Sequence, residues 1–283
     1  MAFLFRFLAL LPLPLLHNLG ALLGWLTYLI SPTYRRNLRQ NLGQAGLQAV
    51  RLAAIGEAGK SLVELPKIWL RPQDEVVARV VRVSGWESIE TAWQEGRGIL
   101  FLTPHLGCFE IAAQYYAAQR SITVLYRLPK QSWLRQLVEV GRGTNLHLAP
   151  ADVGGVRLLM KALKKHEAAG MLPDQVPGVG EGLWTPFFGR PAYTMTLAAR
   201  LAESGATVLL AYAERLPYGA GYHLHIRALA APLAGNRQER VAQLNRELES
   251  LVRQCPEQYL WGYNRYKAPA GEHPPEAEEK VLP

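Results

Sequence analysis

The residues best suited to chemistry lie in one short stretch, TPHLGCFE (103–110). The apolar run before it, 98–103, predicts a buried strand, so His105 lies where a strand gives way to a helix and its imidazole can face a cleft. Glu110 is five residues further on and can fold back to accept a hydrogen bond from the ring Nδ1–H. That bond would leave Nε2 free as a general base for a hydroxyl group, and the carboxylate would stabilise the imidazolium that forms.

No serine nucleophile accompanies this pair, because the sequence has no G-x-S-x-G segment. Cys108 is close enough to be considered, although a buried structural thiol is the commoner role for a free cysteine. The expected chemistry is therefore direct attack by a substrate hydroxyl on an acyl carbonyl. The two cysteines exclude a disulfide framework and a cysteine-built zinc site. His223 and His225 share one face of an expected strand, but no third metal ligand is evident, so we expect neither metal nor cofactor.

Strands and helices alternate through most of the chain, which predicts one α/β domain: an αβα sandwich with a mixed central sheet. Helical spacing of apolar residues also runs through 48–71. The expected strands are 79–84, 98–103, 122–127, 146–149, 169–173, 206–213 and 222–229, and the expected helices are 87–95, 108–119, 131–141, 153–166, 192–204 and 236–253. Ligands of such sheets bind beyond the carboxyl ends of the strands, where His105 is expected.

The first thirty residues are strongly apolar and predict attachment to a membrane. A helix over 7–30 would be about 36 Å long, enough to cross a hydrocarbon core of about 30 Å. Arg35, Arg36 and Arg39 follow it and would hold the rest of the chain on the cytoplasmic side. A buried core helix and a half-inserted interfacial helix remain alternatives, and the depth of insertion stays open.

Composition and charge restrict the class of protein further. Hydrophobic residues make up 49% and charged residues 19% of the 283, which excludes general disorder. The net charge is +8, and the Pro- and Glu-rich tail 268–283 carries −3, so the remainder carries +11 and favours an anionic partner. We expect a membrane-anchoring helix over 1–34, an α/β domain over 35–267 and a disordered tail over 268–283. No nucleic-acid-binding module is recognised, and a nucleic-acid partner is not expected.

Several further segments match one known family in order. They are YR (126–127), GR (141–142), LPDQ (172–175), PFFGRP (186–191), PEQY (256–259) with Trp261, and NRYK (264–267). Together with TPHLG and Glu110, they make the chain resemble the bacterial lipid A late acyltransferases. These are the lauroyl- and myristoyl-transferring enzymes of the lysophospholipid acyltransferase superfamily. The resemblance extends to about Lys267, with one departure, because Leu128 separates the YR pair from Pro129.

The resemblance implies transfer of a C12–C14 acyl group from acyl-acyl carrier protein to a Kdo-bearing lipid A precursor. The acceptor would be a hydroxyl of a primary acyl chain, at the cytoplasmic side of the bacterial inner membrane and in contact with its phospholipid. His105 would be the base and Glu110 its orienting group. The other expected site residues are Arg127 and Arg142 for a phosphate or Kdo carboxylate, Asp174 near the active site, and Phe187 and Phe188 along the acyl channel.

Two other functions remain open at this point. The same chemistry could serve another acceptor, such as a lysophospholipid or a different glycolipid. A membrane-bound lipid-binding or scaffold protein would need no catalytic histidine at all. Lys161, Lys164 and Lys165 form either a solvated helix face or a docking site for the acidic carrier protein.

Overall fold

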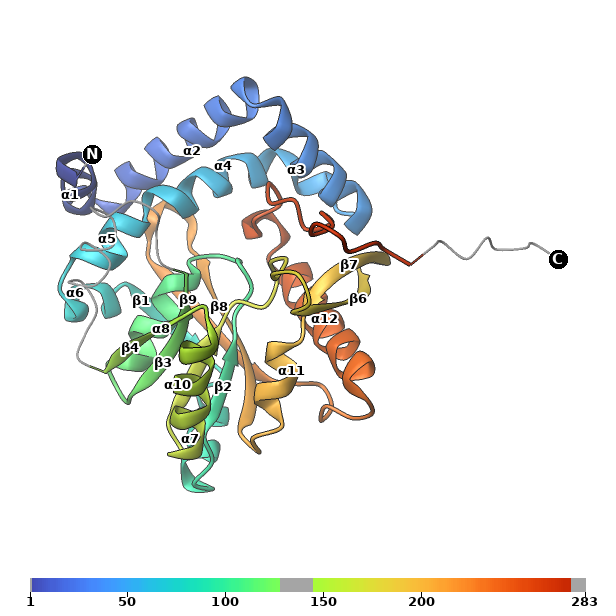
Figure 1. Cartoon of the computed structure of the whole chain (residues 1–283). Helices are drawn as coiled ribbons and strands as arrows, with labels where there is room; N and C mark the ends of the chain where they lie inside the picture. The colour runs from blue at the N-terminus through green and yellow to red at the C-terminus, as the bar shows by residue number, and fades with distance from the viewer. Residues whose placement is uncertain (1, 128–144, 276–283) are drawn as a thin grey trace.

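A seven-stranded sheet forms the centre of the molecule in the computed structural model, which describes residues 2–127 and 145–275 (Figure 1). Its strands are β1 (Val80–Ser84), β2 (Ile99–Leu102), β3 (Ile122–Tyr126), β4 (Leu146–Pro150), β5 (Ala168–Met171), β8 (Thr207–Arg215) and β9 (Tyr222–Ala228). All seven strands expected from the sequence are present. Their order is β1-β9-β8-β2-β5-β3-β4, and every neighbouring pair is parallel except β8 with β9. The sheet is therefore mixed, as expected.

Helices cover both faces of this sheet, which confirms the αβα sandwich. α7 (Glu87–Gln94) and α8 (Phe109–Ala117) lie on one face, and α10 (Val153–Lys164), α11 (Leu197–Ala202) and α12 (Arg237–Gln254) lie on the other. Each face of the sheet has its own hydrophobic core, and alternate residues of a strand belong to one core or the other. Phe101 and Ala211 pack with α8, whereas Leu102 and Leu210 pack with α12. The expected helix 131–141 lies outside the described residues.

A separate hairpin was not expected from the sequence. β6 (Gly182–Phe187) and β7 (Arg190–Met195) pair antiparallel, and the predicted helix 192–204 begins only at α11. The turn consists of Phe188 and Gly189, both at positive φ (47° and 74°), which is typical of two-residue hairpin turns. Asn245 of α12 fastens the hairpin by donating to Thr185 Oγ1 and to the Pro186 carbonyl, each at 2.8 Å.

The apolar start of the chain forms two helices and not the single helix expected over 7–30. α1 (Ala2–Leu10) ends before Pro12, and α2 (Leu13–Ile30) begins after it, because proline cannot continue a helix from the preceding turn. α2 is long and apolar enough to cross a membrane. The helices that follow before β1 are α3 (Pro32–Ala45), α4 (Arg51–Val63), α5 (Leu65–Leu70) and α6 (Gln73–Val77).

α2 is docked on the α/β domain through α4. A Cβ atom at Gly59 would collide with the Gly20 carbonyl oxygen, and one at Gly24 would collide with the Ile55 carbonyl oxygen, so only glycine permits this approach. The two helices also sit over the carboxyl end of β8, where Gly219 packs against Pro14. The ends of β8 and of its parallel neighbour β2 therefore lie on the side of the sheet that α2 and α4 cover.

The beginning of the acidic tail contacts the domain. Glu272 accepts hydrogen bonds from the Tyr193 hydroxyl at 2.8 Å and from the Gly180 backbone N–H at 3.1 Å. Residues 276–283, the rest of the segment expected to be disordered, lie outside the described part of the chain.

Candidate active site

His105 lies just beyond the carboxyl end of β2, as the sequence predicted. Gly107, at φ +61°, turns the chain from β2 toward α8, and a Cβ there would collide with the Ala213 carbonyl oxygen of β8. The turn is held from a second side, because the Leu260 N–H donates to the His105 carbonyl at 3.0 Å. The position of His105 is thus set by β8 and by the segment near Leu260, as well as by its own strand.

The carboxylate that holds the imidazole is Asp174, which follows β5, the parallel neighbour of β2. Asp174 Oδ1 lies 2.8 Å from His105 Nδ1, and Oδ2 accepts from the His105 backbone N–H at 3.0 Å. Burial alone would raise the pKa of the Asp174 carboxyl, but the attraction of His105 and its two hydrogen bonds outweigh burial and lower that pKa. A carboxylate on Nδ1 fixes the tautomer with the proton there and leaves the lone pair on Nε2.

This arrangement differs from the expected one, in which Glu110 accepted from Nδ1–H. Glu110 lies in the first turn of α8 and accepts a hydrogen bond from Trp69 Nε1 of α5 at 3.1 Å. The turn at Gly107 starts α8 in a direction that takes Glu110 toward α5, while the register of β2 and β5 brings Asp174 under the ring. Asp174 was expected near the site, but its contact with the imidazole was not.

The second ring nitrogen faces an amide. Gln175 Nε2 lies 3.1 Å from His105 Nε2, so the amide N–H donates to the lone pair of the neutral imidazole. The Phe109 ring packs against the histidine, with ring centroids 4.9 Å apart. The His105 side chain retains 16% of its surface exposed. A hydroxyl group can therefore reach Nε2 by taking the place of the Gln175 amide.

Cys108 does not have the properties of a nucleophile. Its side chain is buried, and burial together with the charge of Glu64 raises the pKa of the thiol well above its ordinary value. A thiol that stays protonated is a poor nucleophile. The arrangement favours attack by a hydroxyl that does not belong to this chain.

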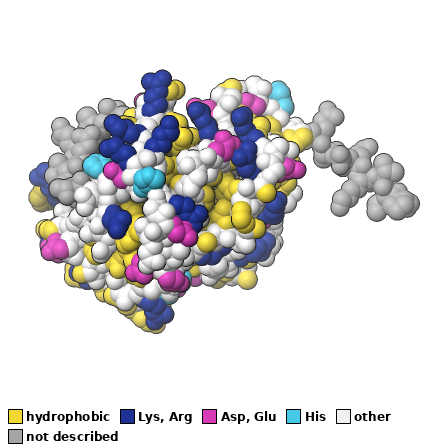
Figure 2. All heavy atoms as spheres, turned by 90° about the horizontal axis from the view of Figure 1, so that it is seen from below, with side chains coloured by type: hydrophobic (Ala, Val, Ile, Leu, Met, Phe, Trp, Pro, Cys, Tyr) yellow, Lys and Arg dark blue, Asp and Glu magenta, His cyan; other side chains and the backbone are white. Residues whose placement is uncertain are grey.

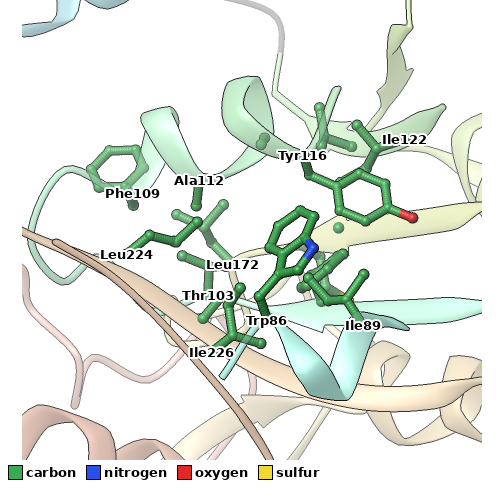
Figure 3. A pocket seen from close by; sticks show the side chains of 16 residues that line it. Trp86, Ile89, Thr103, Phe109, Ala112, Tyr116, Ile122, Leu172, Leu224 and Ile226 are labelled. Atoms are coloured by element: carbon green, nitrogen blue, oxygen red, sulfur yellow. The ribbon is translucent and has the colours of Figure 1, made fainter. Parts of the chain in front are cut away.

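An apolar pocket lies between α8, Trp86 and the sheet (Figure 3), and Phe109, which packs on the His105 ring, forms part of its wall. Thr103 and Phe109, which flank the histidine in sequence, are both part of its wall. The other lining residues are Trp86, Ile89, Phe101, Ala112, Ala113, Tyr116, Ile122, Val124, Gly170, Met171, Leu172, Ala211, Leu224 and Ile226, and these described wall residues include no charged side chain. The empty space between these side chains, counted together with the open solvent at its entrance, measures about 500 Å³.

Phe187 and Phe188 are placed away from this pocket. Both belong to the core on the opposite face of the sheet, where their ring centroids lie 4.8 Å apart. The Phe188 backbone is held by Gln44, which donates to its carbonyl at 2.7 Å, and by Glu249, which accepts from its N–H at 2.7 Å. The two rings thus join the β6–β7 hairpin to α3 and α12, and they do not line the pocket beside His105.

The expected basic residues are only partly described. Arg127 follows β3 and is exposed, at the same edge of the sheet as His105, and Arg142 lies outside the described residues. Lys161, Lys164 and Lys165 are exposed at the end of α10 that leads into the amino end of β5. That end of the sheet is opposite the end at which His105 lies, and the exposure of the three lysines fits both a solvated helix face and a docking surface.

Comparisons with known proteins bear on the family to which the chain belongs. A sequence model of the family described as "Bacterial lipid A biosynthesis acyltransferase" matches residues 1–268. The chain is 29% identical over 270 residues to a lipid A biosynthesis lauroyltransferase of Escherichia coli K12, covering 91% of this chain and 87% of that protein. It is 27% identical over 217 residues to a lipid A biosynthesis palmitoleoyltransferase of the same organism, covering 76% and 70%.

Proposed function

Because the chain belongs to the bacterial lipid A biosynthesis acyltransferases, we propose that it acylates a hydroxyl group on a lipid A precursor, with His105 as general base. The proposed acceptor is a hydroxyl of a primary acyl chain on a Kdo-bearing precursor, and the proposed donor is a C12–C14 acyl-acyl carrier protein. The observation that carries the proposal is the His105–Asp174 pair beside an apolar pocket, whose wall includes Phe109, the residue that packs on the histidine ring.

The reaction needs one proton to move twice. His105 Nε2 takes the proton of the acceptor hydroxyl while its oxygen attacks the thioester carbonyl carbon. The tetrahedral intermediate then collapses, its carbon–sulfur bond breaks, and the proton on Nε2 passes to the departing thiolate. An ester and a thiol are the products. Such base catalysis contributes about 10²–10⁴ to the rate.

The two acidic residues have different proposed roles. Asp174 keeps the proton on Nδ1 and offsets the positive charge that forms on the ring, since its oxygen lies 2.8 Å away. Glu110 accepts from Trp69 and so fixes the first turn of α8, which carries Phe109 against the histidine ring. In this proposal both are positioning residues that act through His105, and neither touches the reacting atoms.

Negative charge on the intermediate must be stabilised by groups other than the loop backbone. The N–H groups of His105, Leu106, Gly107 and Cys108 donate to Asp174, Pro104, Gln258 and Ala213, respectively, so all four are already used. Gln175 loses its partner when a hydroxyl takes its place on Nε2. Its amide N–H then becomes available to the developing oxyanion, which is the kind of donor that such reactions require.

The pocket and the outer helices suit the two lipid substrates. We propose that the hydrocarbon chain of the donor enters the apolar space next to Thr103 and Phe109, so that its carbonyl lies near Nε2; the apolar lining supports this. The edge of the sheet that carries His105 also faces α2 and α4, whose outer surfaces expose large apolar side chains, including Leu22 (65%), Leu29 (65%) and Leu62 (68%). The opposite side of the molecule carries many charged side chains (Figure 2). We therefore propose that α1, α2 and α4 rest in the cytoplasmic leaflet of the inner membrane and place His105 beside it.

Purified enzyme, acyl-carrier thioesters of graded length and a Kdo-lipid A precursor test the proposal directly. We expect ester formation with a maximum at C12–C14, and His105→Ala should lower kcat by at least about 10². His147→Ala, which removes an exposed histidine of β4, is the matched control and should leave kcat unchanged. Circular dichroism would show that each variant is folded. Wild-type turnover by folded His105→Ala would refute the base assignment.

The identity of the acceptor is tested separately. The same enzyme offered a lysophospholipid or a glycolipid without Kdo should release thiol far more slowly than with the Kdo-lipid A precursor. Equal rates on a lysophospholipid would keep His105 as the base and replace the acceptor.

A further inference from the structure

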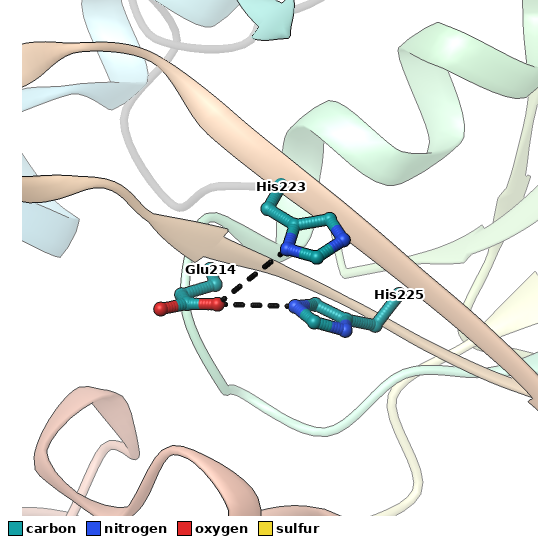
Figure 4. A group of neighbouring side chains, drawn as sticks. All are labelled: Glu214, His223 and His225. Carbon is teal, nitrogen blue, oxygen red and sulfur yellow. Dashed lines mark hydrogen bonds and ion pairs between the residues drawn. The ribbon is translucent and has the colours of Figure 1, made fainter. Parts of the chain in front are cut away.

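Two histidines and a glutamate converge on the face of the sheet that lies away from the pocket (Figure 4). His223 and His225 are two residues apart on β9, so both point to the same face, whereas the pocket-lining Leu224 and Ile226 point to the other. The antiparallel register pairs His223 with Glu214 of β8. The third donor, which the sequence alone did not reveal, therefore comes from the neighbouring strand.

The donor atoms have the spacing of a metal site. Each of the three residues offers one ligand atom, and these atoms all lie within 4.8 Å of one another. Glu214 Oε2 is 3.1 Å from His225 Nε2 and 3.9 Å from His223 Nδ1. Ligand atoms held tetrahedrally at about 2.0–2.1 Å from a zinc ion would be about 3.3 Å apart. Small side-chain rotations would close the remaining difference.

The histidine rings are also held in orientations that suit a ligand. Ser84 Oγ lies 2.8 Å from His223 Nε2, so this bond can hold the proton on Nε2 and direct the Nδ1 lone pair toward Glu214. A polar group on the outer nitrogen is the usual support of a metal-bound histidine. Tyr212 stacks on His225, with ring centroids 4.5 Å apart and planes within 4°. Two of the three ligands thus have fixed orientations.

Access and charge are compatible with a cation. The exposed fractions of the side chains are 10% for His223, 26% for His225 and 34% for Glu214, so an ion could enter from solvent. Two arginines share this face of the sheet. Arg82 lies opposite His223 on β1 but is exposed, and the charge of Arg227 is paired with Glu247 at 2.8 Å.

We propose that Glu214, His223 and His225 form a binding site for a divalent transition-metal ion of the zinc class. Imidazole and carboxylate donors suit such an ion, and three protein ligands leave a fourth position for water. The ion would clamp β8 to β9 one residue beyond Ala213, the strand residue that pairs with Gly107 in the His105 loop. The site faces away from the pocket, so its role is to stabilise the fold and not to take part in acyl transfer.

Equilibrium dialysis of untagged, chelator-treated full-length protein against zinc chloride tests the site. We expect one zinc per chain, measured by elemental analysis, and a melting temperature raised by about 5 °C when zinc is present at about a hundredfold its dissociation constant. His223→Ala, His225→Ala and Glu214→Gln should each weaken binding at least tenfold and abolish the shift. Ser84→Ala should weaken binding about 10–100-fold through the lost support of His223.

His147→Ala is the matched control, because it removes a histidine that lies outside the cluster. This variant should bind zinc as the wild type does. Glu214→Gln keeps the size and a hydrogen-bonding oxygen of glutamate, so it tests the ligand even where an alanine variant is unstable. Absence of stoichiometric zinc in the wild type would overturn the proposal. Binding that survives in Glu214→Gln and both histidine variants would also overturn it, because the ion would then be held elsewhere.

Discussion

His105 is restrained at both ring nitrogens and at both ends of its backbone. Asp174 holds Nδ1 and the backbone N–H, Gln175 faces Nε2, and Leu260 holds the carbonyl. In the proposed mechanism, a base that is already oriented would need no reordering when the substrate arrives, which would lower the entropic part of the barrier. The restraint on Nδ1 is the most important of these, because it decides which nitrogen carries the lone pair.

The first prediction concerns Asp174. In Asp174→Asn the amide can donate to Nδ1 and hold the tautomer of His105 that has its proton on Nε2. In that tautomer Nε2 has no free lone pair and cannot act as a base. We expect kcat to fall by at least about 10², with KM nearly unchanged because the buried Asp174 does not line the pocket. Steady-state kinetics on the acyl-carrier thioester measure both.

Asp152→Asn is a suitable control for Asp174→Asn, because Asp152 caps α10 and asparagine caps equally well. Its kinetics should match the wild type. If Glu110→Gln abolished turnover while Asp174→Asn retained it, Glu110 would be the carboxylate that orients the His105 ring. The role given to Asp174 would then be wrong.

At the scale of elements, the strands were predictable and the contacts between them were not. Runs such as 98–103 and 206–213 have the apolar, β-branched composition of buried strands, and both became strands. The Asp174 and Glu214 contacts depend on which strands are neighbours and in what register, and local sequence does not encode this. Five-residue spacing suggested Glu110, whereas the partner of His105 is 69 residues away.

The β6–β7 hairpin was missed for a local reason. Pro186 and Pro191 interrupt the strand composition, and they are tolerated because they pair with each other in a two-stranded sheet. The turn signal was nevertheless present, since Gly189 lies between two aromatic-rich runs. Reading Phe187-Phe188-Gly189 as a hairpin turn would also have placed both phenylalanines in the core.

A buried ion-pair network joins four elements beneath α2. Arg215 at the end of β8 contacts Glu57 at 3.1 Å and Glu64 at 3.3 Å, both on or next to α4. Glu64 also accepts from the Tyr222 hydroxyl of β9 at 2.9 Å and lies 3.3 Å from His17 of α2. Burial alone would raise the pKa of Glu64, but Arg215, His17 and Tyr222 outweigh burial and lower it. The carboxylate is therefore charged in the folded protein at neutral pH.

The second prediction follows from this network. Glu64→Gln leaves the buried Arg215 less compensated, so the free energy of unfolding at pH 7 should fall by about 3 kcal/mol. A carboxyl with a lowered folded pKa stabilises the protein above its unfolded pKa, near 4.5, and loses that contribution as the pH falls through the folded value. The difference between wild type and variant should therefore narrow below about pH 4.5.

Urea denaturation in detergent at several pH values would measure this difference. Glu90→Gln, at an exposed position of α7, is the control and should change stability little at any pH. A Glu64→Gln protein as stable as the wild type at pH 7, or a difference that widens in acid, would show that the network does not hold α2 and α4 in place.

For the molecule as a whole, the asymmetry of its surface would determine how it meets the membrane in the arrangement proposed above. α2 buries one side against α4 and exposes Leu22, Leu26 and Leu29 on its outer side, and α1 exposes Phe3 and Phe7. A helix docked in this way favours insertion from one leaflet over a free span through the bilayer. Phospholipid would then cover these side chains and lie next to the sheet edge that carries His105.

The last prediction tests whether this apolar outer face of α2 contacts the membrane. Leu22→Glu with Leu29→Glu removes two apolar side chains from the outer face without touching α4, because both are 65% exposed. Burying a leucine in lipid contributes about 1.5–3 kcal/mol, so the double variant should partition into anionic vesicles at least about 10²-fold less, as measured by co-sedimentation. Leu158→Glu, at an exposed leucine of α10, should sediment with vesicles as the wild type does. Unchanged partitioning of the double variant would place the membrane contact on another face, and His105 would then have to receive its lipid through solvent.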